Sequence, residues 1–339
     1  MKINEAEIQV LASIYKAEND GSSTDLASIE AQGGCYSNFK QDWSSAFDSL
    51  IAKGLIVGDE RGYHLTHSGR PLGQKYRNER PDLYWYYYQK FYSAAHASPT
   101  HSRLCERVFG GDLCQEGQTD MDSLNHLLKL LDLKDKESVL DLGCGAGVIS
   151  EYISDQTGAQ VTGIDYAASA IAEATERTSD KKFRLNFIHG DFSNLDLEPN
   201  SYDAVISIDT LYWDDVLEKI LSMLVVALRP GGRMGIFLNH HINVSESSEL
   251  LNAEHSKLSQ VLSSLGLAVE IFNYTKELGE FWHRLHMATT ELWDDFEAEG
   301  NGFIPANYIR EAEEDHLPEI NAGTIARHLY IVRPGHMST

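Results

Sequence analysis

A run of glycines directly after an apolar segment constrains this chain more than any other feature. Residues 138–142, Ser-Val-Leu-Asp-Leu, predict a buried strand, and Gly143-Cys144-Gly145-Ala146-Gly147 leads from it into a predicted helix over 148–154. A tight turn of this kind lets a ligand approach the backbone N–H groups and the positive end of the helix dipole. The dinucleotide fingerprint GxGxxG would need glycine at position 148, where the chain has valine, so a nicotinamide or flavin cofactor is disfavoured.

Strands and helices alternate along residues 121–339, which we interpret as one α/β domain. Strands connected by helices imply parallel pairing, so we expect a doubly wound, Rossmann-like sheet of seven strands, with a helix over 167–178 between the second and third. Residues 276–320, between the last two strands, predict a helical insertion. After the strand at 138–142, apolar runs predict strands at 161–165, 185–189, 204–208, 234–237, 267–274 and 325–332.

Residues 1–80 predict a separate domain of three helices followed by a hairpin. The third helix is the clearest, because its apolar residues form one stripe that ends at Gly54. Three helices and a hairpin resemble a winged helix. The predicted elements are helices after the cap Asn4, from Thr24 and over 39–51, and a hairpin over 55–66.

Winged helices often bind DNA, but the charge of this chain argues against that function. Residues 1–80 contain 9 Lys and Arg against 11 Asp and Glu, whereas a DNA-binding domain normally has a basic surface. The whole chain has 28 basic and 51 acidic residues, a net charge of −23, which repels phosphate backbones. We therefore expect no nucleic-acid partner and interpret residues 1–80 as a packing or dimerisation domain.

Residues 81–120 contain an unusual density of aromatic side chains, seven of them between Tyr84 and Tyr92. Two interpretations fit equally well. The segment is a helix packed between two domains, or it is a linker and lid whose aromatic faces, including Tyr88 and Tyr92, border a ligand pocket.

Cysteine usage and hydropathy indicate the compartment. The four cysteines form no CxxC pair and no metal-ligand spacing, so we expect neither a zinc site nor a disulfide framework. The sequence starts without a cationic and apolar leader, and no uncharged stretch reaches the roughly 18 residues that a membrane span needs. We expect a cytoplasmic protein without a metal ion or a membrane partner.

The glycine segment and the segments that follow it resemble a known family. Residues 139–147 resemble the first motif of class I S-adenosylmethionine-dependent methyltransferases, small-molecule type, and the likeness continues in order to residue 237. This resemblance implies a Rossmann-like fold and S-adenosylmethionine as cofactor. The later motifs are matched by Gly163-Ile164-Asp165, Gly190-Asp191-Phe192, residues 203–209 and Leu228-Arg229-Pro230-Gly231-Gly232.

The motif positions have physical roles in holding the cofactor. Asp165, at the end of the second strand, is placed to accept hydrogen bonds from both ribose hydroxyls. The resemblance implies that Asp191 accepts the adenine amine, that Phe192 faces the adenine ring, and that Asp141 and the glycine loop contact the methionine part. Asp191 and Asp209 could instead be helix caps or turn residues. The candidate cofactor-binding residues are Asp141, Gly143, Cys144, Gly145, Asp165, Tyr166, Asp191, Phe192 and Asp209.

With this cofactor, the expected reaction is in-line displacement of a methyl group by a small-molecule O, N or S nucleophile. Positioning two reactants contributes about 7–11 kcal/mol and a general base about 3–5 kcal/mol, so we expect no dedicated triad. Candidate catalytic residues follow the fourth and fifth strands: Asp209, Tyr212, His240 and His241. Substrate or lid candidates are Tyr88, Tyr92, His101 and Gln115, with Glu116 beside them.

Several alternatives stay open. Plant-type O-methyltransferases have a histidine soon after the fourth strand, and this chain has none in residues 209–214, so their mechanism is not expected. The ten acidic residues over 291–319 could favour an amine acceptor or form a solvated helical face. The two-part layout resembles homodimeric small-molecule methyltransferases, among which enzymes that methylate thioethers also occur. The other function classes are a winged-helix regulator that senses S-adenosylmethionine and a methyltransferase acting on a macromolecule.

Overall fold

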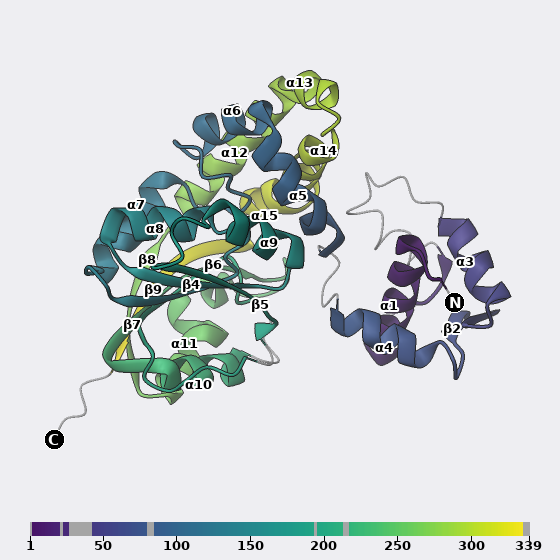
Figure 1. Ribbon diagram of the computed structural model, residues 1–339, viewed down its shortest axis with the longest axis horizontal. Helices are drawn as coiled ribbons and strands as arrows, with labels where there is room; N and C mark the ends of the chain where they lie inside the picture. Colours follow the sequence, from purple (N-terminus) through teal and green to yellow (C-terminus); the bar gives the residue numbers. More distant parts are fainter. Residues whose placement is uncertain are drawn as a thin grey trace. The chain divides into compact units, whose positions relative to one another are not determined.

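The computed structural model describes residues 2–20, 23–26, 43–79, 85–192, 195–212 and 217–334. The chain divides into two compact units, Met1–Phe91 and Tyr92–Thr339 (Figure 1). The division falls inside the aromatic segment predicted as a linker and lid.

The first unit contains helices packed with a two-stranded hairpin. Asn4 and Glu7 form a reciprocal cap at the first helix, because each side chain accepts from the other residue's backbone N–H, at 2.9 and 2.8 Å. The predicted first and third helices and the hairpin are confirmed, whereas residues 27–42, which include Phe39 and most of the predicted second helix, lie outside the described residues. The winged helix therefore stays a prediction. The elements are α1 (Glu5–Asp20), α3 (Trp43–Ala52), β1 (Ile56–Asp59), β2 (Gly62–Leu65) and α4 (Arg70–Glu79).

A seven-stranded sheet forms the centre of the second unit, in the order β5-β4-β3-β6-β7-β9-β8. The predicted doubly wound sheet is confirmed, but the expectation of parallel pairing throughout is wrong at β9. That strand runs antiparallel to both β7 and β8. The strands are β3 (Ser138–Leu142), β4 (Gln160–Asp165), β5 (Leu185–His189), β6 (Tyr202–Ile208), β7 (Leu228–His241), β8 (Leu267–Asn273) and β9 (Ile325–Pro334).

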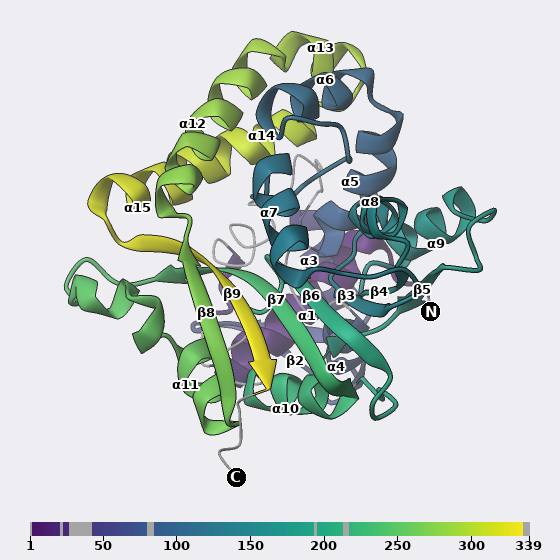
Figure 2. The same ribbon diagram turned by 90° about the vertical axis from the view of Figure 1, so that its left-hand side faces the viewer.

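The direction of β9 follows from the helical segment that precedes it. The helices between β8 and β9 gather at the edge of the sheet where the parallel strands end, as Figure 2 shows. The chain therefore re-enters the sheet from that edge and runs back, so that Ile325 pairs with His241 at the end of β7. We call these helices the helical cover. They are α12 (Thr275–Glu291), α13 (Trp293–Ala298), α14 (Phe303–Arg310), the π-helix η4 (Glu311–His316) and α15 (Leu317–Ala322).

Helices pack on both faces of the sheet and give it two apolar cores. Side chains of α10 and α11 form the core on one face, and those of α7 and α8 form the core on the other. A three-layer arrangement results, which is the usual solution for a sheet of mostly parallel strands. The remaining helices are α5 (Trp85–Ala97), α6 (Pro99–Val108), α7 (Met121–Leu131), α8 (Val148–Thr157), α9 (Ala168–Arg177), α10 (Leu217–Ala227), the 3-10 turns η2 (Ser248–Leu251) and η3 (Ala253–His255), and α11 (Lys257–Ser264).

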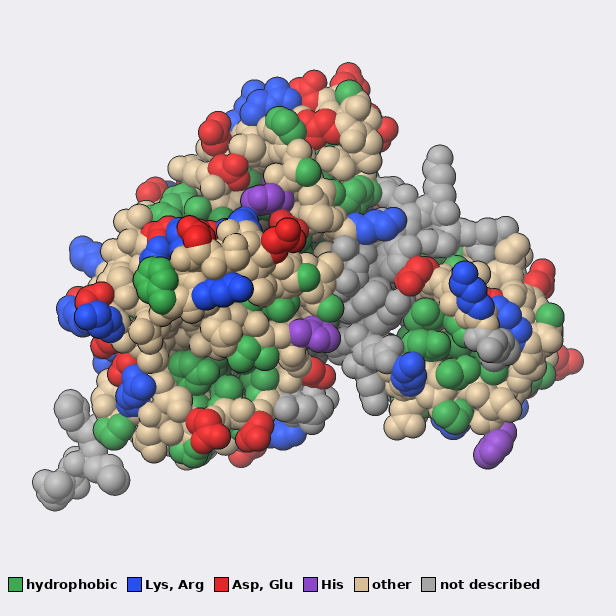
Figure 3. All heavy atoms as spheres, in the orientation of Figure 1, with side chains coloured by type: hydrophobic (Ala, Val, Ile, Leu, Met, Phe, Trp, Pro, Cys, Tyr) green, Lys and Arg blue, Asp and Glu red, His purple; other side chains and the backbone are tan. Residues whose placement is uncertain are grey.

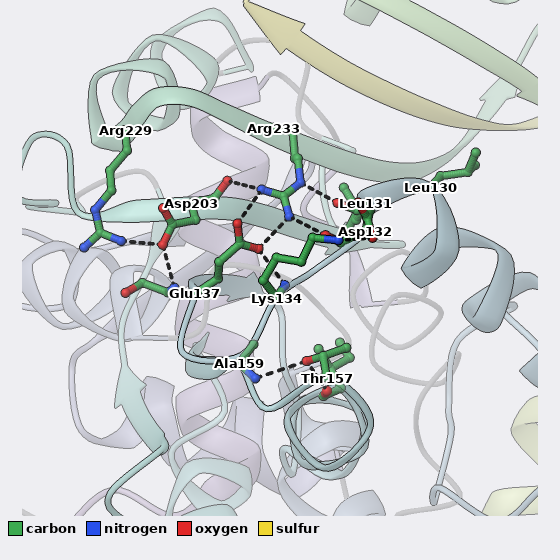
Figure 4. Close-up of polar contacts among 12 residues, drawn as sticks. Leu130, Leu131, Asp132, Lys134, Glu137, Thr157, Ala159, Asp203, Arg229 and Arg233 are labelled. Atoms are coloured by element: carbon green, nitrogen blue, oxygen red, sulfur yellow. Dashed lines mark hydrogen bonds and ion pairs between the residues drawn. The ribbon is translucent and has the colours of Figure 1, made fainter.

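Ion pairs join the strands at the amino-terminal edge of the sheet (Figure 4). Arg233 on β7 donates to both carboxylate oxygens of Glu137, at 3.2 and 2.6 Å. Arg229 pairs with Asp203, whose carboxylate also accepts from the backbone N–H of Ser138 at 2.8 Å. Where residues 228–232 were predicted as a turn, the pairing of β7 with β6 shifts register, from Tyr202↔Leu228 to Ala204↔Arg233.

Charges of both signs are distributed over the second unit. Figure 3 shows blue basic side chains singly or in small groups among red acidic ones on its visible face. Of the helices that the structure describes, none combines the length and the apolar composition needed to cross a membrane. Within the described ranges, no group of three or more His, Cys, Asp or Glu side chains is placed to hold a metal ion.

Candidate active site

The glycine loop after β3 has a backbone that only glycine adopts easily. Gly143, Gly145 and Gly147 have φ angles of 76°, 53° and 70°, all in the left-handed region. A Cβ atom on Gly143 would lie 2.0 Å from the Thr210 side chain, and one on Gly147 would lie 2.4 Å from the Phe187 ring. Conformation and close packing therefore both require glycine here, and Thr210 holds the loop against the end of β6.

Asp165 connects the end of β4 to this loop. Its Oδ2 accepts a hydrogen bond from the backbone N–H of Gly145 at 2.9 Å, and its Oδ1 accepts from Ala167 at 2.8 Å. A carboxylate has about four lone-pair sites, so both oxygens can accept further bonds. The side chain is thus oriented at the glycine loop, where two vicinal hydroxyls of a ribose would find two acceptors.

A second buried carboxylate, Asp141, lies within β3 and accepts a hydrogen bond from the Ser150 hydroxyl. Burial raises the pKa of Asp141 to about 6, and the nearby charge of Asp165 adds to the rise. Burial, with the same two carboxylates, also raises the pKa of the Cys144 thiol well above its ordinary value. A pair of desolvated carboxylates suits a ligand with a positive charge, as the amino group and sulfonium of S-adenosylmethionine would provide.

Tyr92, an aromatic residue of the predicted lid, contacts the glycine loop. A Cβ atom on Gly145 would lie 2.6 Å from its hydroxyl oxygen. Burial and then the Asp165 carboxylate raise the pKa of the Tyr92 phenol well above its usual range, so it stays protonated. Tyr88 belongs to the first unit and its predicted role stays a prediction.

Asp209, predicted as a candidate base, lies in a buried ion pair. Its carboxylate oxygens accept from the two Nη atoms of Arg327 at 2.5 and 3.0 Å, and also from the Gln118 backbone at 3.0 Å and the Tyr212 hydroxyl at 3.1 Å. Burial by itself would lower the pKa of Arg327, but the Asp209 charge outweighs it and raises that pKa. Both carboxylate oxygens of Asp209 are occupied by Arg327, so this geometry favours a positioning role for Asp209.

The pair extends into a network that joins four parts of the chain. Arg327 also donates to the Asn239 side chain at 2.9 Å and to the Thr119 hydroxyl at 2.8 Å. Asn239 in turn donates to the Gln118 side chain at 2.7 Å. The network thus fixes residues 118–119 and the carboxyl-terminal ends of β6 and β7 against the start of β9. We call it the Arg327 network.

Sequence reasoning missed Arg327, although a signal was present. It is the charged residue in the apolar run Ile325-Ala326-Arg327-His328-Leu329-Tyr330-Ile331-Val332. A charge on a buried strand needs an opposite charge, and the sequence offered no means of choosing Asp209 from 51 acidic residues.

The adjacent histidines predicted as candidates point to opposite faces of β7, because strand side chains alternate. His240 lies 2.6 Å from the Tyr330 hydroxyl on the face of α11, and burial lowers its pKa to about 4. His241 is exposed and pairs with Glu319 of the helical cover at 3.0 Å. The structure therefore does not bring the two histidines together as a catalytic pair.

The remaining predicted residues are distributed around this edge. His101 is buried between Cys105 and the Tyr308 hydroxyl, and burial lowers its pKa to about 4. Gln115 is buried and accepts from the Leu113 backbone at 2.8 Å. Nε2 of His189 lies 3.1 Å from the Tyr166 carbonyl, and Asp191 is partly buried. Phe192 packs in the core of the α10 and α11 face, so little of its ring is open to a ligand.

The sheet order, the glycine loop after the central strand and the carboxylate on the neighbouring strand define an S-adenosylmethionine-dependent methyltransferase fold. A phosphoethanolamine N-methyltransferase 2 of Haemonchus contortus, solved with phosphomonomethylethanolamine and S-adenosylhomocysteine, has a TM-score of 0.58 at 19% identity over 74% of this chain and 60% of its own. A cyclopropane synthase of Mycobacterium tuberculosis has a TM-score of 0.57 at 12% identity over 72% of this chain and 98% of its own. At these identities the likeness shows the fold.

Residues 139–232 match the family model described as a methyltransferase domain. The resemblance predicted from the motifs is thereby confirmed over these residues, and the cofactor of this class is S-adenosylmethionine. The chain is 27% identical over 193 residues to a sterol 24-C-methyltransferase of Candida albicans, covering 55% of this chain and 49% of the relative. It is 29% identical over 171 residues to phosphoethanolamine N-methyltransferase 2 of Caenorhabditis elegans, covering 50% and 39%. It thus spans half or less of these curated relatives.

Proposed function

We propose that this protein transfers a methyl group from S-adenosylmethionine to a small molecule by in-line displacement. The observation that carries the proposal is the contact between the Asp165 carboxylate and the Gly145 backbone N–H at 2.9 Å. It places a buried acceptor for ribose hydroxyls directly at a loop of left-handed glycines. The named relatives, which act on sterols and phosphoethanolamine, support an enzyme that acts on a small molecule.

The residues of the site have separate roles in this reaction. Asp165 would hold the ribose, and Asp141 with the glycine loop would hold the methionine part, whose sulfonium supplies an electrophilic methyl group. Tyr92 covers the loop and excludes water from it. The Arg327 network keeps the ends of β6 and β7 in place, so that an acceptor meets the methyl group at a fixed distance and angle. Positioning of this kind contributes about 7–11 kcal/mol.

Proton removal has a smaller part in the proposal. Asp209 is neutralised by Arg327, and the lowered pKa of about 4 makes His240 a weak base at neutral pH. The positioning of donor and acceptor therefore supplies most of the rate, as expected for a cofactor that is already an activated methyl donor.

Incubation with isotope-labelled S-adenosylmethionine and a metabolite extract tests the function. We expect a product heavier by one labelled methyl group by mass spectrometry, and no such product with Asp165→Ala. If the wild-type protein binds the cofactor tightly but labels no metabolite, the proposal of a regulator that senses S-adenosylmethionine replaces the enzyme. Labelled protein or nucleic acid instead of a metabolite would indicate a macromolecular substrate.

We also propose that the protein is a cytoplasmic homodimer whose first unit provides the dimer contact. Four cysteines without disulfide spacing and the near-neutral charge of residues 1–80 support this. Light scattering of the full chain tests the oligomeric state, and a mass of 37.9 kDa, that of one chain, would contradict the dimer.

A further inference from the structure

Several buried polar atoms in the helical cover have no hydrogen-bond partner among the residues that the structure describes. They are Nε1 of Trp282 and Oγ1 of Thr289 on α12, and both amide atoms of Asn307 on α14. Trp282, Thr289 and Asn307 are 2%, 0% and 5% exposed. A buried polar group without a partner costs about 1–3 kcal/mol, so these side chains require a polar group that the described residues do not supply.

His316 adds a fourth such side chain and an unusual backbone. Its ring stacks on Trp282 with the centroids 4.0 Å apart, and its Nδ1 also has no partner in the described part of the chain. It ends the π-helix η4. A π-helix is rare and occurs frequently at functional sites. Here it places His316 on the indole of Trp282.

The stacked pair of His316 and Trp282 lies close to the end of β6, where the methyl group would be transferred. The charges of His241, Asp209, Arg327 and Arg310 all act on His316, which places the stacked pair near the Arg327 network. Asn307 lies one helical turn before Arg310 on α14, and α12, α14 and η4 contact one another. The stacked pair of Trp282 and His316 therefore belongs to the part of the cover that is turned toward the sheet, and α14, which carries Asn307, packs against α12 and η4.

The charged groups around His316 have partners within the described residues. Arg327 pairs with Asp209, and His241 lies 3.0 Å from Glu319. Arg310 pairs with Asp315 at 3.0 Å and with the buried Glu311 at 3.6 Å. Burial, followed by the charge of His241, lowers the pKa of His316 to about 3, so this ring is neutral at pH 7. A phosphate or an ammonium group brought here would need an opposite charge that the pairs would have to give up.

We propose that the inner face of α12, α14 and η4 binds the methyl acceptor, and that the acceptor is an uncharged molecule with an apolar body and a hydroxyl group. A hydroxyl both donates and accepts, so it matches the indole N–H of Trp282, the amide of Asn307 and the ring of His316. Buried leucines of α12, Leu278 and Leu285, supply apolar contacts beside them. The inference rests on the proposed methyltransferase function and adds the substrate class.

Fractionating the extract by charge tests the substrate class. The metabolite extract is separated by ion exchange into neutral, cationic and anionic fractions, and each is incubated with the protein and labelled S-adenosylmethionine. We expect the labelled methyl group in the neutral fraction. Label in the cationic or anionic fraction would overturn the inference and leave the methyltransferase function intact. Absence of label from every fraction would overturn both.

Two variants test the residues. Asn307→Leu removes both amide atoms at similar volume, and Trp282→Phe keeps the aromatic stack but removes the N–H. With the neutral fraction limiting, we expect each to lower the initial rate at least about tenfold, with the Kd for S-adenosylmethionine within twofold of wild type. Asn321→Leu on α15 and Trp293→Phe on α13 are the matched controls.

The outcomes of these variants are separable. Unchanged rates in both would show that the buried polar atoms serve folding or internal water and would overturn the inference. A variant whose affinity for S-adenosylmethionine falls by the same factor as its initial rate would also count against the inference. If Asn307→Leu does not fold, Trp282→Phe, which keeps most of the buried ring, decides the question.

Discussion

The two ends of the same sheet use ion pairs of similar chemistry in different surroundings. At the amino-terminal edge, the side chains of Arg229 and Asp203 are 40% and 24% exposed. At the carboxyl-terminal edge, those of Arg327 and Asp209 are 2% and 10% exposed. Water and salt screen the first pair. The second pair is buried, so removal of one partner leaves the other as an uncompensated charge in the protein interior. The first pair is therefore replaceable, and the second fixes the geometry of the candidate site.

The largest effect should come from breaking the buried pair. Arg327→Met leaves Asp209 buried without its counter-charge, and we expect the free energy of unfolding to fall by about 3–5 kcal/mol. The matched change at the other edge, Arg229→Met, should cost less than about 1 kcal/mol. Urea denaturation measures both. In the double variant Arg327→Met with Asp209→Asn, much of the stability should return while turnover stays low. Equal losses of stability for Arg327→Met and Arg229→Met would contradict the difference between the two edges.

Asp165→Ala should have the next largest effect, on cofactor binding. The variant loses the acceptor for two ribose hydroxyls, each a charge-assisted bond, so we expect calorimetry to show S-adenosylmethionine affinity at least about 100-fold weaker. Glu137→Ala, a carboxylate at the opposite edge, is the control and should leave affinity within twofold. Tight binding by Asp165→Ala would refute the ribose assignment.

Substitution of Asp141 should have smaller effects, which are opposite in sign: higher stability and weaker cofactor binding. Burial raises the pKa of Asp141 to about 6 in the folded protein. The ionised carboxylate therefore lowers the free energy of unfolding above pH 6. This loss disappears as the pH falls toward the pKa of an aspartate in the unfolded chain, about 3.9. Asp141→Asn should therefore raise the free energy of unfolding at pH 7.5 by about 1–3 kcal/mol, while weakening cofactor binding. The gain should vanish near pH 4 in melting curves.

The same group gives wild-type cofactor affinity a pH dependence. Protonated Asp141 cannot attract a cationic ligand, so the Kd for S-adenosylmethionine should rise as the pH falls below about 6. Asp141→Asn should show a flatter profile. A parallel pH dependence in variant and wild type would exclude Asp141 as its source.

The smallest effect is expected at Tyr92. Tyr92→Ala removes the ring that contacts the glycine loop, so we expect kcat/KM to fall about three- to tenfold, about 0.6–1.4 kcal/mol of transition-state stabilisation, in a variant that still folds. Tyr152→Ala on α8 is the control. Normal kinetics in a stable Tyr92→Ala variant would contradict the lid.

Much of the fold could be predicted because its signals are local. Each strand of the sheet is a short apolar run, and the glycine loop and Asp165 lie at the ends of such runs. The direction of β9 could not be predicted, because it depends on which edge of the sheet the helical cover occupies. The π-helix gave no signal either, since its six residues are too few for the longer repeat of a π-helix to show in the apolar pattern.

The candidate site divides in the same way. Residues near the first two strands were found from motif spacing, as with Gly145 and Asp165. Arg327 could not be found from motif spacing, because its partner Asp209 lies 118 residues away in the sequence. Asp209 was singled out as a possible base from its place after β6, and only its partner shows that the carboxylate is neutralised. Trp282 and His316 meet across two helices, which no local pattern indicates.

The position of β9 has a consequence for how a nascent chain matures. Because β9 lies between β7 and β8, the ribosome makes both neighbours before the strand that joins them. Until β9 is synthesised, β8 has no neighbouring strand, β7 has an unpaired edge, and Asp209 lacks its ion-pair partner Arg327. Exposed strand edges of this kind invite pairing with other chains. We therefore expect the nascent chain to bind chaperones mainly after residue 273, the end of β8, has left the ribosome and before residue 334, the end of β9, has left it.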